Sequence, residues 1–263
     1  MAGHNRGNRN RATVAGIRKK LGENGVTLGS WMQINNPSVA EIMGHAGYDW
    51  VAVDLEHGHF SISALPDLFR ALELGGTLPF ARVARGGEKE IKQVMDAGAK
   101  GVIIPMTESA AQIESCISAA FYPPKGTRGV GYSRANLFGK GFDDYAGSHM
   151  DDIFIVAQIE SITGVDNLPD ILAVEGLDAI IVGPYDLSGS MGITGAFDNP
   201  EFTAVLDKVE SCCRAAGVPS GLHVVQPDPA LLKEKTGRGY QFIAYGTDAV
   251  FLYCQAEASD LLP

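Results

Sequence analysis

The sequence predicts a single (β/α)8 barrel preceded by a helix, and three observations support this fold class. Short apolar runs alternate with segments of helical periodicity along the 263 residues. Eight such runs occur, and several are continuously apolar, which is typical of strands buried on both faces of a parallel sheet. Right-handed crossovers between eight parallel strands close most simply into a barrel. An open doubly wound sheet is the alternative.

The predicted strands each end next to polar, glycine or proline residues, as strands that lead into loops do. They are expected at Thr27–Gln33, Trp50–Asp54, Pro79–Val83, Gly101–Pro105, Ile153–Glu160, Ala179–Val182, Pro219–Leu222 and Phe242–Tyr245.

Helical periodicity occupies most of the segments between these strands. Pro37–His45 follows Asn36, a good N-cap residue, and has proline at its first position. Glu88–Ala97 ends just before Gly98, a typical stop for a helix. The other expected helices are Asn10–Leu21, Ser63–Leu74, Glu108–Ala120, Val165–Val174, Pro200–Ala216 and Ala249–Leu262.

One connection, Phe121–Met150, is too long for a loop without secondary structure of its own. We expect it to hold short helices or to be functional. No shift in composition marks a second domain, so residues 1–263 are expected to form one domain, with residues 1–9 as a flexible arm.

Composition excludes several classes of partner. The formal net charge of -10 argues against nucleic acid, because phosphate binding needs a basic face. No run approaches the roughly 18 apolar residues that a membrane span needs, and the N-terminus lacks the apolar core of a signal peptide. The four cysteines contain no C-x-x-C pair. We therefore expect a cytoplasmic protein with reduced thiols.

The chemistry is expected at the carboxyl ends of the strands, where barrels bind their ligands. Glu160 and Asp186 follow neighbouring strands. Two carboxylates with open positions suit a hard divalent cation such as Mg²⁺ or Mn²⁺, completed by water or substrate oxygens. The alternative is that each carboxylate caps the helix that follows it.

A histidine and an arginine lie at the ends of two other strands. His57 follows Asp54 and Glu56, and a histidine oriented by a carboxylate can act as a general base or acid. The alternative is a histidine bonded to a backbone carbonyl. Arg82 ends an apolar strand and needs an anion, supplied by a ligand carboxylate or by a neighbouring Asp or Glu. His223 is a weaker candidate, because it follows the seventh predicted strand.

Several activities lack their motifs. The chain has no G-x-x-x-x-G-K-[ST], no strand-linked G-x-G-x-x-G and no G-x-S-x-G, so neither nucleotide binding nor serine hydrolysis is supported. No lysine stands at the end of a predicted strand, which disfavours an aldolase that forms a Schiff base.

Five segments together resemble the HpcH/HpaI aldolase family, the metal-dependent class II pyruvate aldolases of the phosphoenolpyruvate/pyruvate barrel superfamily. They are LGSWMQINNPSVAEIMGHAGYDWVAVDLEHG, IKQVMDAGAKGVIIPM, YPPKGTRGVG, VAQIES and VEGLDAIIVGPYDLS. They span about residues 28–251 in the family's order. The resemblance favours the closed barrel over the open sheet.

The resemblance implies a role for each matching residue. Glu160 and Asp186 correspond to the metal ligands, for Mg²⁺, Mn²⁺ or Co²⁺, and His57 corresponds to the catalytic base, supported by Asp54 and Glu56. Arg82 corresponds to the arginine that contacts pyruvate and its enolate. Gln158 matches a substrate contact, and the backbone at Pro184, Tyr185 and Asp186 would receive the pyruvate carboxylate. Tyr185 stands where relatives often have a small residue, which bears on substrate size.

The function implied is reversible aldol cleavage of a 4-hydroxy-2-oxo acid to pyruvate and an aldehyde. The segment SRANLFGKGFDDY resembles relatives that cleave sugar acids more than those that cleave products of aromatic degradation. This resemblance implies a 2-keto-3-deoxy sugar acid or a related diacid as substrate. A Claisen-type or CoA-thioester lyase or synthase of the same superfamily is the alternative enzyme, and a sensor that only binds a metal or oxo acid is the non-enzymatic one. The family also implies a homo-oligomer, a hexamer built as a trimer of dimers, in which the last helix is exchanged between subunits.

Overall fold

The computed structural model describes residues 11–148 and 151–257 and shows a closed barrel of eight parallel strands. Each strand pairs with its neighbours in sequence, and β8 pairs with β1 to close the barrel. The strands are β1 (Thr27–Met32), β2 (Trp50–Asp54), β3 (Leu78–Arg82), β4 (Gly101–Ile104), β5 (Phe154–Ile159), β6 (Ala179–Val182), β7 (Gly221–Val224) and β8 (Phe242–Thr247). The closed barrel confirms the predicted fold and excludes the open sheet.

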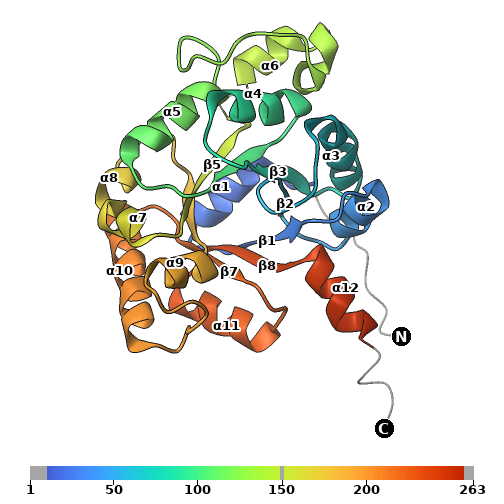
Figure 1. Ribbon diagram of the computed structural model, residues 1–263. Coiled ribbons are helices and arrows are strands. Elements are labelled where there is room, and N and C mark those ends of the chain that lie inside the picture. The colour runs from blue at the N-terminus through green and yellow to red at the C-terminus, as the bar shows by residue number, and fades with distance from the viewer. Residues whose placement is uncertain (1–10, 149–150, 258–263) are drawn as a thin grey trace.

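Helices surround the barrel as an outer layer (Figure 1). They are α1 (Val14–Gly22), α2 (Pro37–His45), α3 (Leu65–Leu74), α4 (Glu88–Ala97), α5 (Ala110–Ala120), α6 (Phe142–Ser148), α7 (Ile162–Asp166), α8 (Leu168–Leu172), α9 (Pro184–Ser190), α10 (Pro200–Ala216), α11 (Pro229–Arg238) and α12 (Asp248–Ala256), with short 3-10 helices η1 (Ile62–Ala64) and η2 (Arg134–Gly139). Among the described residues, no helix is both long and apolar enough to cross a membrane.

Most predicted elements lie where expected, and the exceptions have local causes. The helix predicted at Val165–Val174 is the pair α7 and α8, because Pro169 has no N–H to continue the helical bonding from α7. The seventh strand lies two residues later than predicted and includes His223. Helix α11, which follows it, was not predicted. Of the last predicted helix, residues 258–262 lie outside the described residues, as does the arm at residues 1–9.

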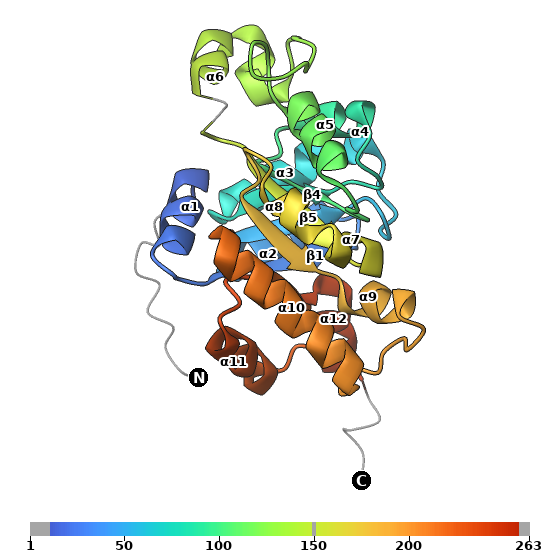
Figure 2. The ribbon, with the colours of Figure 1, turned by 90° about the vertical axis from the view of Figure 1, so that its left-hand side faces the viewer.

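The long connection at residues 121–150 holds η2 and α6, as expected for its length. Figures 1 and 2 show this segment outside α4 and α5, away from the strands. Two ion pairs hold it to the barrel's helices. Nη2 of the buried Arg128 lies 2.6 Å from Oδ1 of Asp96 in α4, and Nη2 of Arg134 lies 2.5 Å from Oε2 of Glu73 in α3.

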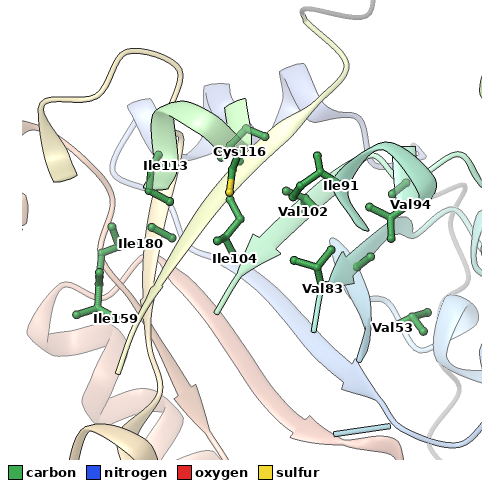
Figure 3. Packing of buried hydrophobic residues seen from close by; sticks show 14 of the residues in the cluster. Val53, Val83, Ile91, Val94, Val102, Ile104, Ile113, Cys116, Ile159 and Ile180 are labelled. Atoms are coloured by element: carbon green, nitrogen blue, oxygen red, sulfur yellow. The ribbon is translucent and has the colours of Figure 1, made fainter. Parts of the chain in front are cut away.

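The main core lies between the strands and the helices. Outward-facing residues of the strands, such as Val102 and Ile104 on β4, pack against Ile91 of α4 and Cys116 of α5 (Figure 3). All four side chains are completely buried. Most outward positions of the strands are therefore apolar, with the buried Ser30 of β1 as an exception, which explains why the strands are recognisable as apolar runs.

A second core fills the inside of the barrel near the amino ends of the strands. Trp50 stacks on Phe242 with ring centroids 4.4 Å apart and on Phe80 at 5.4 Å, and Phe154 packs against both phenylalanines. A Cβ at Gly29 would lie 2.1 Å from the Trp50 ring, so glycine leaves the room that this stack needs. The aromatic rings close the barrel at this end, and polar residues occupy its interior at the other.

Candidate active site

The carboxyl ends of β2 and β3 carry a buried ion pair. Asp54 and Arg82 are register partners, so the parallel pairing itself sets them side by side. Nε of Arg82 donates to Oδ1 of Asp54 at 2.9 Å, and Nη2 donates to Oδ2 at 2.7 Å. Burial alone would raise the pKa of Asp54, but the bonds and charge of Arg82 outweigh it and hold that pKa below its usual value. The anion that Arg82 requires is thus supplied by the protein.

The turn after β2 places Glu56 and His57 beside this pair. The backbone N–H groups of both residues donate to Oδ1 of Asp54, at 3.1 and 3.2 Å. Oε2 of Glu56 lies 3.3 Å from Nη1 of Arg82 and 4.0 Å from Nε2 of His57. The His57 ring is 59% exposed and lines the cavity described below. Glu56, rather than Asp54, is therefore the carboxylate closest to the imidazole.

Glu160 follows β5 and is buried at the mouth of the barrel. Oε1 accepts a hydrogen bond from the backbone N–H of Met106 at 2.5 Å, and Oε2 accepts one from Nε2 of Gln158. Burial raises the pKa of Glu160 to about 7, and the charges of Glu56 and Asp186 add to this rise against the opposing hydrogen bonds. The next helix is capped by Ser161, not by Glu160, so the structure does not support the capping alternative for this residue.

Gly183, which follows β6, makes room for this carboxylate. A Cβ at this position would lie 2.7 Å from Oε2 of Glu160 and 3.1 Å from Nε2 of Gln158. Pro184, Tyr185 and Asp186 then form the first turn of α9. Asp186 is exposed and Pro184 is buried. The ring of Tyr185 packs edge-on against Phe197, with centroids 4.9 Å apart, instead of standing free at the mouth.

A cavity of about 340 Å³ opens at this end of the barrel. It brings together His57, Arg82, Gln158, Pro184, Tyr185 and Asp186 of the predicted site. Asp54, Glu56 and Glu160 are not among its lining residues but contact residues that are. All the predicted site residues therefore gather around one end of the barrel.

The same cavity is lined by residues that were not assigned to the site from the sequence. Trp31 lies under the guanidinium of Arg82, whose Cζ is 4.5 Å from the ring centroid, and Gln33 donates to Oδ2 of Asp54 at 3.0 Å. Trp31 lies near the end of β1, and Gln33 follows that strand directly. Their position at the carboxyl end of a strand could have identified them as site residues from the sequence. Met106, which bonds Glu160, has a φ of +47°, unusual for a side chain of its size. No sequence pattern marks that conformation.

Comparison with known proteins identifies relatives of nearly full length. A family model described as HpcH/HpaI aldolase/citrate lyase matches residues 27–253. A hydroxypyruvate/pyruvate aldolase of Roseobacter denitrificans is 35% identical over 90% of this chain and 92% of its own. A 2-keto-3-deoxy-L-rhamnonate aldolase of Escherichia coli is 36% identical over 91% and 89%. The crystal structure of an HpcH/HpaI aldolase/citrate lyase family protein from Burkholderia cenocepacia superimposes with a TM-score of 0.87, at 28% identity, covering 93% of this chain and 97% of that one.

Proposed function

Because the chain belongs to the HpcH/HpaI aldolase/citrate lyase family, we propose that it is a divalent-metal-dependent lyase that cleaves a 4-hydroxy-2-oxo acid reversibly to pyruvate and an aldehyde. The proposed substrate is a 2-keto-3-deoxy sugar acid or a related diacid. The observation that carries the metal dependence is the position of Glu160, a buried carboxylate at the barrel mouth whose pKa is raised further by two other carboxylates.

The donor set fits a hard cation whose coordination is completed by other oxygens. Glu160 and Asp186 would be the protein ligands, and both supply carboxylate oxygens, which Mg²⁺ and Mn²⁺ prefer. Among residues 11–148 and 151–257, no three His, Cys, Asp or Glu side chains converge as a group that could hold an ion. Two protein ligands would leave positions for water and for a 2-oxo acid. When bound, the cation would supply Lewis-acid stabilisation of negative charge on the oxo acid's oxygen.

The protein's own residues would bind the oxo acid and move the proton. Arg82, fixed by Asp54 and Glu56, presents positive charge at the cavity and stabilises the enolate oxygen. His57 takes the proton from the C4 hydroxyl, and its Nε2 lies 4.0 Å from Oε2 of Glu56. The C3–C4 bond then breaks, the aldehyde leaves, and the electron pair of that bond remains on pyruvate as the enolate. Water then protonates the enolate at C3, and His57 returns its proton to the solvent. Gln158 and the backbone at Tyr185 and Asp186 hold the oxo acid.

Metal removal and two variants test this proposal. We expect EDTA to abolish aldol cleavage and added Mn²⁺, Mg²⁺ or Co²⁺ to restore it, while borohydride with pyruvate traps no covalent adduct. Glu160→Ala and Asp186→Ala should each lose activity by about a hundredfold or more, whereas Glu41→Ala, an exposed change on α2, should not. Full activity in either site variant would contradict the ligand assignment. Turnover of an acyl-CoA with oxaloacetate or glyoxylate, without cleavage activity, would favour the Claisen-type alternative.

We further propose that the protein is a homo-oligomer that buries α12 against another subunit. Asp248 is the only buried residue of this helix, and Leu252 and Tyr253 are 62% and 65% exposed. An apolar helix face exposed to this extent is typical of an interaction surface.

A further inference from the structure

Three buried polar atoms line the cavity and have no hydrogen-bond partner among the described residues. They are Nε1 of Trp31, Oε1 of Gln158 and Nε2 of His223. A buried polar atom left without a partner costs about 1–3 kcal/mol. Three such atoms around one cavity therefore indicate that a polar ligand or water supplies their missing hydrogen bonds. The proposed reaction already uses Gln158, but it gives no role to His223.

His223 is held in a fixed position inside the barrel. It pairs in register with Ala244 of β8, and its neighbours Leu222 and Val224 belong to the core under the helices, so the His223 side chain points inward. Its ring lies edge-on to Trp31 with centroids 5.7 Å apart. The guanidinium of Arg82 also lies against the Trp31 ring. His223 is thus one aromatic ring away from the arginine that would contact the oxo acid.

The surroundings of His223 decide which hydrogen bond Nε2 can make. Burial lowers the pKa of His223 to about 3, and the charge of Arg82 acts in the same direction, so the ring is neutral at ordinary pH. The ring also bonds the backbone carbonyl of Gly246, which requires its N–H. Nε2 is left as an acceptor. The lone pair of Nε2 repels a keto or carboxylate oxygen, and it finds no hydrogen-bond donor in a methyl group. A hydroxyl group, in contrast, can donate a hydrogen bond to Nε2.

We propose that Nε2 of His223 accepts a hydrogen bond from a hydroxyl group of the substrate and makes the enzyme select hydroxylated substrates over their deoxy analogues. This inference rests on the proposed function. The hydroxyl has two possible sources: C3 of the 2-oxo acid, as in hydroxypyruvate, or the carbon chain of the aldehyde. In either case the selectivity arises because the deoxy analogue leaves a buried acceptor unpaired.

The experiment compares kcat/KM for paired substrates with the Mn²⁺-loaded enzyme. One arm uses hydroxypyruvate against pyruvate with acetaldehyde, and the other uses glycolaldehyde against acetaldehyde with pyruvate. In one arm, His223→Leu should reduce the preference for the hydroxylated substrate by about tenfold or more. His223→Gln should restore much of it, since its amide oxygen can occupy the place of Nε2. His45→Gln, an exposed change on α2, is the matched control and should alter neither ratio.

The arm that changes identifies which substrate carries the hydroxyl. Unchanged ratios in both arms with a folded His223→Leu variant, checked by its circular dichroism melt, would overturn the proposal. Calorimetry of hydroxypyruvate and pyruvate binding gives a readout that does not depend on turnover. If the wild type neither cleaves nor exchanges the C3 protons of pyruvate in deuterated buffer, the proposed function fails. The inference about His223 then fails as well unless calorimetry shows a preference for hydroxypyruvate that the leucine variant loses.

Discussion

At the scale of single residues, Glu160 shows how burial prepares a carboxylate for a cation. The folded protein holds its pKa near 7, above the ordinary value of 4.5. Between these two values the folded state binds a proton that the unfolded chain does not. Stability from this group is therefore present at low pH and is lost as pH rises through the folded pKa. A cation bound at the site would balance the carboxylate's negative charge in place of that proton. It would therefore remove the loss of stability that comes from burying the ionised carboxylate.

This linkage predicts the behaviour of Glu160→Gln in metal-free protein. The amide stays neutral, so the variant should gain stability relative to wild type by about 2–3 kcal/mol between pH 5 and pH 8. Urea unfolding in EDTA at both pH values measures the difference, with the exposed Glu41→Gln as the control. If the free energy of unfolding depended on pH in the same way for wild type and Glu160→Gln, burial would impose no penalty on the ionised carboxylate, and this prediction would be wrong.

Gly183 offers a second test at this scale, because its role is to leave space. Its φ of -89° is open to alanine, so Gly183→Ala should act only through the added Cβ, which would crowd Oε2 of Glu160. We expect the affinity for Mn²⁺, measured by calorimetry, to fall tenfold or more, as changes beside a ligand typically do. Gly189→Ala, inside the helix α9 that follows Gly183, is the control, since its Cβ would meet only Oγ1 of Thr194, at 3.4 Å. Equal affinities in the two variants would contradict this account.

At the scale of elements, α12 is held by its first half, where Phe251 packs against Tyr48 and Tyr245. The carboxylate of Asp248 accepts hydrogen bonds from the backbone of Gln33 at 2.8 Å and of Ile34 at 2.9 Å, which ties the start of the helix to the end of β1. The rest of the helix extends away from the barrel (Figure 1). The double variant Leu252→Asp/Tyr253→Asp should therefore weaken subunit association.

Light scattering after size exclusion measures this effect as a lower mass at a given concentration. Leu74→Asp is the matched control, because Leu74 is 65% exposed on α3. A wild-type monomer, or an unchanged mass in the double variant, would contradict the proposed oligomer.

The elements that the sequence predicted well are those buried on both faces, since their apolar runs are continuous. The prediction of β7 ended at Leu222 because His223 interrupts the apolar run, although the strand continues to Val224. Helix α11 was missed because none of its residues is buried, so it has no strong apolar face to mark it. The prediction thus failed at a polar residue inside a strand and at a helix with no buried face.

At the scale of the whole molecule, the position of the site was predictable because parallel strands end together. Asp54 and Arg82 are adjacent by register alone, and the pairing of Ile159 with Val182 brings the residues that follow them, Glu160 and Gly183, side by side. The side-chain details were not predictable in the same way. The stacking of Arg82 on Trp31 and the backbone conformation of Met106 depend on contacts between segments far apart in the sequence.

The two tryptophans meet edge-on inside the barrel, with ring centroids 6.4 Å apart. Trp50 is completely buried in the aromatic stack, while Trp31 lines the cavity beside Arg82 and His223. The chain has no other tryptophan. Its intrinsic fluorescence therefore comes from one pair of tryptophans in contact, of which only Trp31 lines the cavity. Occupation of the cavity should alter the emission of Trp31 directly and that of Trp50 only through Trp31, because Trp31 lines the cavity and Trp50 does not. Trp31→Phe should therefore give a protein whose emission reports unfolding with little response to ligand.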